Sequence, residues 1–137
     1  MRIATCDDNA VETALLGKLL DKYATTKDNI EYDLFTNVDK LLTAVSSKAY
    51  DVILLDVIMP GINGIEAARE IRSYNNAVEI VFLTSSPEYA LESYSVRADD
   101  YLIKPVKKEM LFPVLDRLYG KIEKNDENIV LLSARNV

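Results

Sequence analysis

Val52-Ile53-Leu54-Leu55-Asp56 is the most informative stretch of this 137-residue sequence. Four aliphatic residues follow one another without a polar break, and an acidic residue stands at each end. A strand with one solvated face alternates apolar and polar residues, whereas a continuous apolar run is typical of a strand that helices cover on both faces. The run is also short for a buried helix. We therefore predict a central parallel strand over 52–55.

Similar short runs on either side of this stretch predict the other strands, over 3–6, 30–35, 79–83 and 100–103. Segments with helical spacing separate them, beginning near Asn9 and Thr36 and covering 64–73, 88–94 and about 108–124. Pro113 lies inside the last of these and predicts a bend or a late start there. Five strands alternating with five helices predict an α/β fold with a doubly wound parallel sheet.

Composition excludes several functional classes. Sixteen Lys and Arg against 22 Asp and Glu give a net charge of −6, which argues against binding nucleic acid or an anionic membrane directly. The absence of histidine excludes Ser-His-Asp and Cys-His catalysis, His-ligated zinc and a phosphohistidine donor. A single cysteine, Cys6, excludes an internal disulfide and fits a reducing cytosol.

No targeting or membrane segment is expected. The short apolar stretch at the N-terminus meets acids at Asp7 and Asp8, unlike a signal peptide. No apolar run approaches the ~20 residues of a transmembrane helix. We therefore expect a cytoplasmic protein without a membrane partner.

Residues that could share one site follow four of the five predicted strands. They are Asp7 and Asp8, Asp56, Thr84 and Ser85, and Lys104 followed by Pro105. Aspartate is common at strand ends because it caps helices and tolerates turns, so each residue alone says little. In open α/β sheets, however, ligands bind beyond the carboxyl ends of the strands, where the strand order reverses. The combination therefore indicates a shared site.

The chemistry of that site follows from the residue types. If the strand order is 2-1-3-4-5, Asp7, Asp8 and Asp56 converge, and three adjacent carboxylates repel one another unless a cation neutralises them. Oxygen ligands without nitrogen or sulfur favour Mg²⁺. Together with the positive charge of Lys104 and the hydroxyl of Thr84, this set indicates transfer of a phosphoryl group to a carboxylate nucleophile.

At these residues the sequence resembles the receiver domain of two-component response regulators, over about 2–122. The motifs are the acid pair, Leu55-Asp56-Val57-Ile58-Met59-Pro60-Gly61 with Gly64, Thr84-Ser85 and Lys104-Pro105. The resemblance implies a flavodoxin-like (βα)5 fold with strand order 2-1-3-4-5. The segments 89–94 and 98–102 look most like LytR/AlgR-like regulators, which carry a LytTR-type DNA-binding domain.

The resemblance also implies roles for the acidic residues. Asp56 would be the phosphoacceptor, and Asp7, Asp8, Asp56 and the main-chain carbonyl of Ile58 would hold Mg²⁺. Lys104 would bind phosphoryl oxygens. Such a domain catalyses only its own phosphorylation and dephosphorylation, so it is not an enzyme in the usual sense.

Further implied roles concern switching. Thr84 would bind a phosphoryl oxygen beside Lys104, and Tyr101 would be an aromatic switch that turns inward on activation. The Lys104–Pro105 bond would be cis, since X-Pro bonds adopt this form at modest cost.

The expected partner is a sensor histidine kinase, which would carry the phosphohistidine that this chain cannot supply. Residues 1–122 would form the receiver, and 123–137 a linker with the possible start of a C-terminal DNA-binding domain. DNA would be bound, and transcription regulated, only through that absent domain. Phosphorylation could drive homodimerisation. A receiver that acts alone by docking to a partner protein is the alternative.

Two positions depart from the family pattern. Ile58 stands where many members have a polar residue, and Arg97-Ala98 where Gly-Ala is frequent. Ile58 also weighs against a phosphatase resembling the haloacid dehalogenases, which need a second aspartate there. In those proteins the acid pair comes late in the chain, whereas Asp7 and Asp8 come first.

Overall fold

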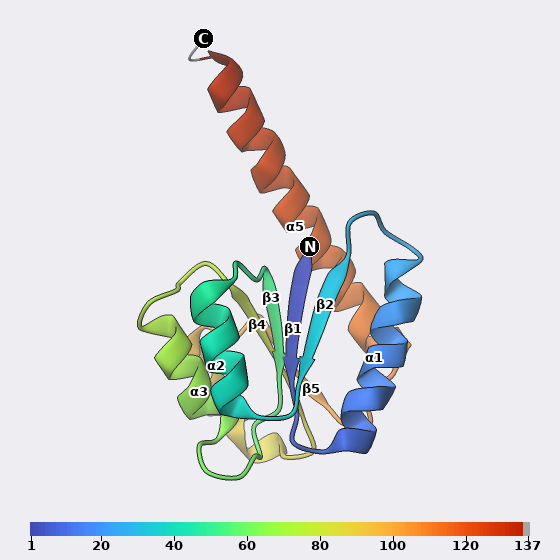
Figure 1. Ribbon diagram of the computed structural model, residues 1–137, viewed down its shortest axis with the longest axis vertical. Coiled ribbons are helices and arrows are strands. Elements are labelled where there is room, and N and C mark those ends of the chain that lie inside the picture. The colour runs from blue at the N-terminus through green and yellow to red at the C-terminus, as the bar shows by residue number, and fades with distance from the viewer. Residues whose placement is uncertain (136–137) are drawn as a thin grey trace.

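The computed structural model describes residues 1–135, with side chains placed through residue 125. Five parallel strands form one sheet in the order β2-β1-β3-β4-β5, which confirms the predicted topology (Figure 1). The strands are β1 (Arg2–Cys6), β2 (Glu31–Phe35), β3 (Val52–Leu55), β4 (Glu79–Thr84) and β5 (Asp100–Ile103).

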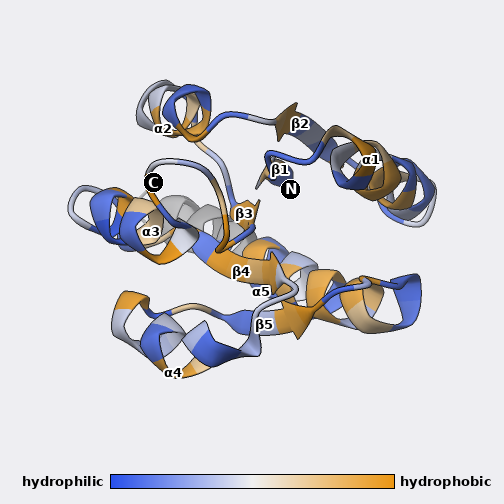
Figure 2. Ribbon diagram, turned by 90° about the horizontal axis from the view of Figure 1, so that it is seen from below, coloured by the Kyte–Doolittle hydropathy of each residue, from blue (hydrophilic) through white to orange (hydrophobic). Residues whose placement is uncertain are grey.

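Helices cover both faces of the sheet (Figure 2). The helices are α1 (Ala10–Ala24), α2 (Val38–Ser47), α3 (Gly64–Arg72), α4 (Ala90–Ser93) and α5 (Lys108–Arg135). Helices α2 and α3 bury residues such as Leu41 and Ile71 in one core, and α1 and α5 bury residues such as Leu20 and Leu115 in the other. None of these helices, within residues 1–135, combines the length and apolarity needed to cross a membrane.

Strand β3 has the two-sided burial that its sequence predicts. All four of its residues are buried, with Ile53 and Leu55 in the core under α2 and α3 and Val52 and Leu54 in the core under α1 and α5. It pairs with β1 on one side and β4 on the other. This central position places the residue after it, Asp56, near the middle of the sheet edge.

Asparagine residues cap three of the helices. The side chains of Asn9, Asn37 and Asn63 each accept a hydrogen bond from the backbone N–H three residues later, which satisfies an otherwise unpaired donor. Asn9 stands where the first helix was expected to begin. The second helix, expected to begin at Thr36, instead begins after Asn37.

The predicted helix over 88–94 is broken rather than continuous. A 3₁₀ turn, η1 (Pro87–Tyr89), precedes the single turn of α4, and a second, η2 (Tyr94–Val96), follows it. The Ser93 hydroxyl donates back to the Ala90 carbonyl, a bond that competes with helix continuation. Arg97 then ends the segment with φ of 54°, the left-handed region that favours glycine.

Helix α5 extends beyond the end predicted near residue 124 and projects past the sheet (Figure 1). Residues 123–128, expected as part of a linker, are helical, and they contain no Gly or Pro that would interrupt a helix. The helix continues through Arg135, within the segment 123–137 that was expected to hold a linker and the possible start of a further domain. Pro113 is accommodated inside the helix.

Candidate functional site

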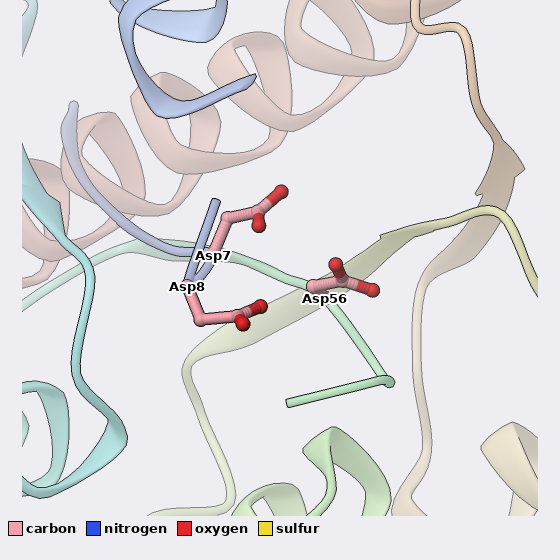
Figure 3. Close-up of side chains that lie close together, drawn as sticks. All are labelled: Asp7, Asp8 and Asp56. Carbon is pink, nitrogen blue, oxygen red and sulfur yellow. The ribbon is translucent and has the colours of Figure 1, made fainter. Parts of the chain in front are cut away.

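Three aspartates meet at the carboxyl ends of β1 and β3 (Figure 3). These strands are neighbours, with Cys6 paired to Leu55, so the residues that follow them are brought together. One carboxylate oxygen from each of Asp7, Asp8 and Asp56 lies within 4.8 Å of the others. Asp7 and Asp56 are buried, whereas Asp8 is exposed.

This set of donors fits a magnesium ion. It offers only carboxylate oxygens, which are hard ligands, and two of the three groups are buried where like charges need a counterion. Backbone N–H groups hold the two buried carboxylates. Asn9 donates to Asp7 Oδ1 over 2.9 Å, and Ile58 donates to Asp56 Oδ1 over 3.2 Å.

Lys104, from the end of β5, supplies the positive charge of the site. Its Nζ lies 2.6 Å from Asp7 Oδ2 and 2.8 Å from Asp56 Oδ2, and it also pairs with Glu12 of α1. Burial by itself lowers the pKa of Lys104, but hydrogen bonds to Asp56, Asp7 and Glu12 outweigh burial and raise that pKa above its ordinary value. The ammonium is therefore charged throughout the physiological range.

Glu12 is the site residue that the sequence did not predict. Its N–H donates to the Asn9 side chain at the start of α1, and its carboxylate pairs with Lys104, 92 positions further along the sequence. The only available signal was its place one helical turn beyond the acid pair.

Thr84 and Tyr101 are joined through the backbone of one residue. Thr84, at the end of β4, is fully buried, and its Oγ1 accepts a hydrogen bond from the Ser86 N–H over 3.3 Å. The Tyr101 hydroxyl donates to the Ser86 carbonyl. The ring of Tyr101 is half-buried, with its centroid 6.0 Å from that of Phe82, and burial chiefly raises the pKa of Tyr101. The predicted pair therefore lies in one hydrogen-bonded path.

The pairing of β4 with β5 places Lys104 beside Thr84. The Lys104 N–H donates to the Thr84 carbonyl over 2.9 Å. The Lys104–Pro105 peptide bond is cis, as expected. Ser85, which follows Thr84, is exposed.

Cys6 is not a nucleophile of this site. Its thiol is buried against β3, and burial, then Asp7 and Asp56, raise the pKa of Cys6 to about 12. Since the thiolate is the reactive form, the thiol is inert at neutral pH.

A cavity of about 140 Å³ opens beside the charged groups, between α1 and the loop that follows β5. Asp7, Glu12, Asp56 and Lys104 border it, and the remaining wall is mostly aliphatic. The aliphatic lining is Leu15, Leu16, Leu19, Leu54, Leu83 and Val106. The charged groups thus border a cavity whose remaining lining is mostly apolar.

Curated relatives match most of the chain. It is 31% identical over 120 residues to the positive alginate biosynthesis regulatory protein of Pseudomonas aeruginosa, covering 85% of this chain and 46% of that protein. It is 29% identical over 125 residues to the sensory transduction protein LytT of Bacillus subtilis, covering 91% and 50%. The chain thus spans about half the length of these relatives, and they confirm the predicted likeness to LytR/AlgR-like regulators.

A solved structure and a family model agree with these relatives. The structure of response regulator protein TrrA from Thermotoga maritima, in complex with Mg²⁺-BeF, is 32% identical. It has a TM-score of 0.75 and covers 85% of this chain and 97% of its own. The family model for the response regulator receiver domain matches residues 3–116. The chain belongs to the response regulator receiver domain family.

Proposed function

We propose that this receiver domain accepts a phosphoryl group on Asp56 from the phosphohistidine of a sensor kinase, in a magnesium-dependent reaction. The observation that carries the proposal is the contact of the Lys104 ammonium with Asp56 and Asp7, beside a third carboxylate from Asp8. A nucleophile, a fixed positive charge and a metal-binding donor set then lie in one place.

Asp56 suits the role of nucleophile. Its Oδ1 is held by the Ile58 N–H and its Oδ2 by Lys104, so the carboxylate has a fixed direction. A carboxylate oxygen would attack phosphorus while the phosphorus–nitrogen bond of the donor breaks, its electron pair returning to the imidazole.

Charge neutralisation is the main demand of the reaction. Mg²⁺ bound by Asp7, Asp8 and Asp56, with the Ile58 carbonyl as a further proposed ligand, would offset the negative charge of the phosphoryl oxygens. Lys104 adds a positive charge that it keeps at every physiological pH. The Thr84 hydroxyl would donate to a phosphoryl oxygen.

Thr84 and Tyr101 would carry the response away from the site. If the Thr84 hydroxyl turns toward the phosphoryl group, its contact with the Ser86 N–H is lost. Ser86 also holds the Tyr101 hydroxyl, so the same change weakens the bond that keeps the ring in place. Tyr101 would then turn inward and alter the surface formed by α4 and β5.

The output function of the protein would lie in a part other than residues 1–137. The relatives are about twice as long and include regulatory proteins of transcription, such as RprY of Bacteroides fragilis, 34% identical over 136 residues. We infer that a further, DNA-binding part of the protein regulates transcription, with homodimerisation on phosphorylation as one route. The net charge of −6 supports the view that this part does not itself bind duplex DNA. A salt-sensitive gel shift by residues 1–137 alone would contradict that view.

Acetyl phosphate with Mg²⁺ tests the acceptor. Intact-mass spectrometry should show one added phosphoryl group, labile in base, on the wild type and none on Asp56→Asn. Asp39→Asn, which removes an exposed carboxylate from α2, is the matched control and should label like the wild type. Equal labelling of Asp56→Asn and the wild type would overturn the assignment.

A further inference from the structure

The ammonium of Lys104 has no free hydrogen-bond donor. It carries three N–H groups, and three carboxylates, those of Asp7, Glu12 and Asp56, accept from it. Any new acceptor must therefore displace one of them. A phosphoryl oxygen on Asp56 would be such an acceptor.

The position of Glu12 depends on how α1 begins. At a helix start with Asn at the cap and Glu three residues later, the Glu side chain commonly reaches back to the cap residue's N–H. Here the Asn9 N–H already donates to Asp7 Oδ1, 2.9 Å away. The Asn9 side chain accepts from the Glu12 N–H, but the Glu12 carboxylate has no backbone partner to return to. It bonds to Lys104 instead.

The three carboxylates differ in their access to water. The side chain of Glu12 is 42% exposed, compared with 10% for Asp7 and 9% for Asp56. Releasing a buried carboxylate from its ion pair leaves an uncompensated charge, whereas a half-exposed one is solvated at once. Glu12 is therefore the partner that Lys104 gives up at the lowest cost.

We propose that Glu12 is a positioning residue that occupies, in the unphosphorylated protein, the N–H of Lys104 that a phosphoryl oxygen takes on phosphorylation. This inference rests on the proposed function. Glu12 keeps the ammonium directed into the site. Because a phosphoryl oxygen has to displace the Glu12 carboxylate from Lys104, the affinity of the site for the phosphoryl group is lower than it would be without Glu12. Glu12 thereby sets how readily the phosphorylated form is populated.

Beryllofluoride at saturating Mg²⁺ is the probe, because it replaces the phosphoryl group without turnover. In Glu12→Gln the competing negative charge is absent, so half-saturation should occur at about threefold to tenfold lower beryllofluoride. Glu66→Gln is the matched control. Glu66 stands at the same place in α3, with its N–H capped by Asn63, and it is exposed and has no contact with Lys104.

The NMR chemical shift of the Lys104 side chain is a second readout, which would not change if Glu12 had only a structural role. Glu12→Gln should shift this signal in the free protein, and the shift should shrink once beryllofluoride is bound, because the contact is then absent in both proteins. Equal or weaker beryllofluoride binding by Glu12→Gln would overturn the proposal, as would a Lys104 difference that persists unchanged in the bound state. A wild type that fails to bind beryllofluoride with Mg²⁺ would instead overturn the proposed function.

Discussion

Gly64, the first residue of α3, lies directly against the backbone of the proposed acceptor. A Cβ atom added there would stand 2.1 Å from the Asp56 carbonyl oxygen and 2.8 Å from Val57 Cα. Both neighbours are main-chain atoms, so no side-chain rotation relieves the overlap. The substitution Gly64→Ala therefore has to move the start of α3 and the residues after β3 apart by roughly 1 Å.

The expected loss of stability follows from three contributions. Overpacking against backbone costs about 1–3 kcal/mol. The hydrogen bond from the Gly64 N–H to the Val57 carbonyl, 2.8 Å long, is weakened and costs about 1 kcal/mol more. The better helix propensity of alanine returns less than ~1 kcal/mol. We expect a net loss of about 2–3 kcal/mol in the free energy of unfolding.

Urea unfolding and acetyl phosphate labelling measure the two consequences of Gly64→Ala. The unfolding midpoint should fall, and labelling of the folded variant should slow by about tenfold or more, because Asp56 moves with its backbone. Gly120→Ala is the control: apart from the adjoining backbone of its own helix, no atom lies within 4 Å of its added Cβ, and inside α5 it should gain about 0.5–1 kcal/mol. Gly64→Ala with the wild-type midpoint and labelling rate would refute the reasoning.

Three further predictions concern other parts of the molecule. Arg72→Ala should lower the free energy of unfolding by about 2 kcal/mol. The guanidinium donates to the carbonyl of Val78 before β4 and to those of Val96 and Arg97 at the end of η2, and all of these bonds would be lost. A change below ~0.5 kcal/mol in urea unfolding would contradict this. Burial and the hydrogen bond to Asp33 raise the pKa of Tyr50 to about 12 from 10.0, so its contribution to stability is complete below pH ~10 and is lost as pH rises through about 12. Urea unfolding of Tyr50→Phe should show a shallower alkaline decline, and equal slopes would count against the assignment. Mg²⁺ should raise the free energy of unfolding of the wild type, by about 2.7 kcal/mol at 100 times its dissociation constant, and much less in Asp8→Asn; an undiminished effect would exclude Asp8 as a ligand.

The sheet and most of the site were predictable because parallel topology converts sequence order into position. Continuous aliphatic runs such as 52–55 identify strands buried on both faces. Once the strand order is known, the residues after neighbouring strands must meet, as Asp7 and Asp56 do. The proposed chemistry then rests on the residue types that meet there.

The contact of Glu12, the role of Ser86 and the end of α5 could not be predicted, for physical reasons. The pair between Glu12 and Lys104 depends on how α1 sits against the loop after β5, and periodicity carries no such information. The role of Ser86 is carried by its backbone groups, which leave no mark in the sequence. Residues 123–128 have the polarity of a linker, yet they contain no Gly or Pro to interrupt the helix, so polarity alone did not reveal that α5 continues.

The broken form of α4 bears on where a response to phosphorylation can emerge. One α turn between two 3₁₀ turns has little stability of its own, and Leu91 and Tyr94 are 82% and 77% exposed. The segment packs on the core through Val96, which is buried, and through Tyr89, which is partly buried. The far end of this segment is fixed, since Arg72 donates to the Val96 carbonyl over 2.8 Å. The near end is held by the Tyr101 hydroxyl on Ser86. Loss of that bond would leave only the partial packing of Tyr89 to hold the near end, so the displacement should be greatest in η1 and decline toward Val96.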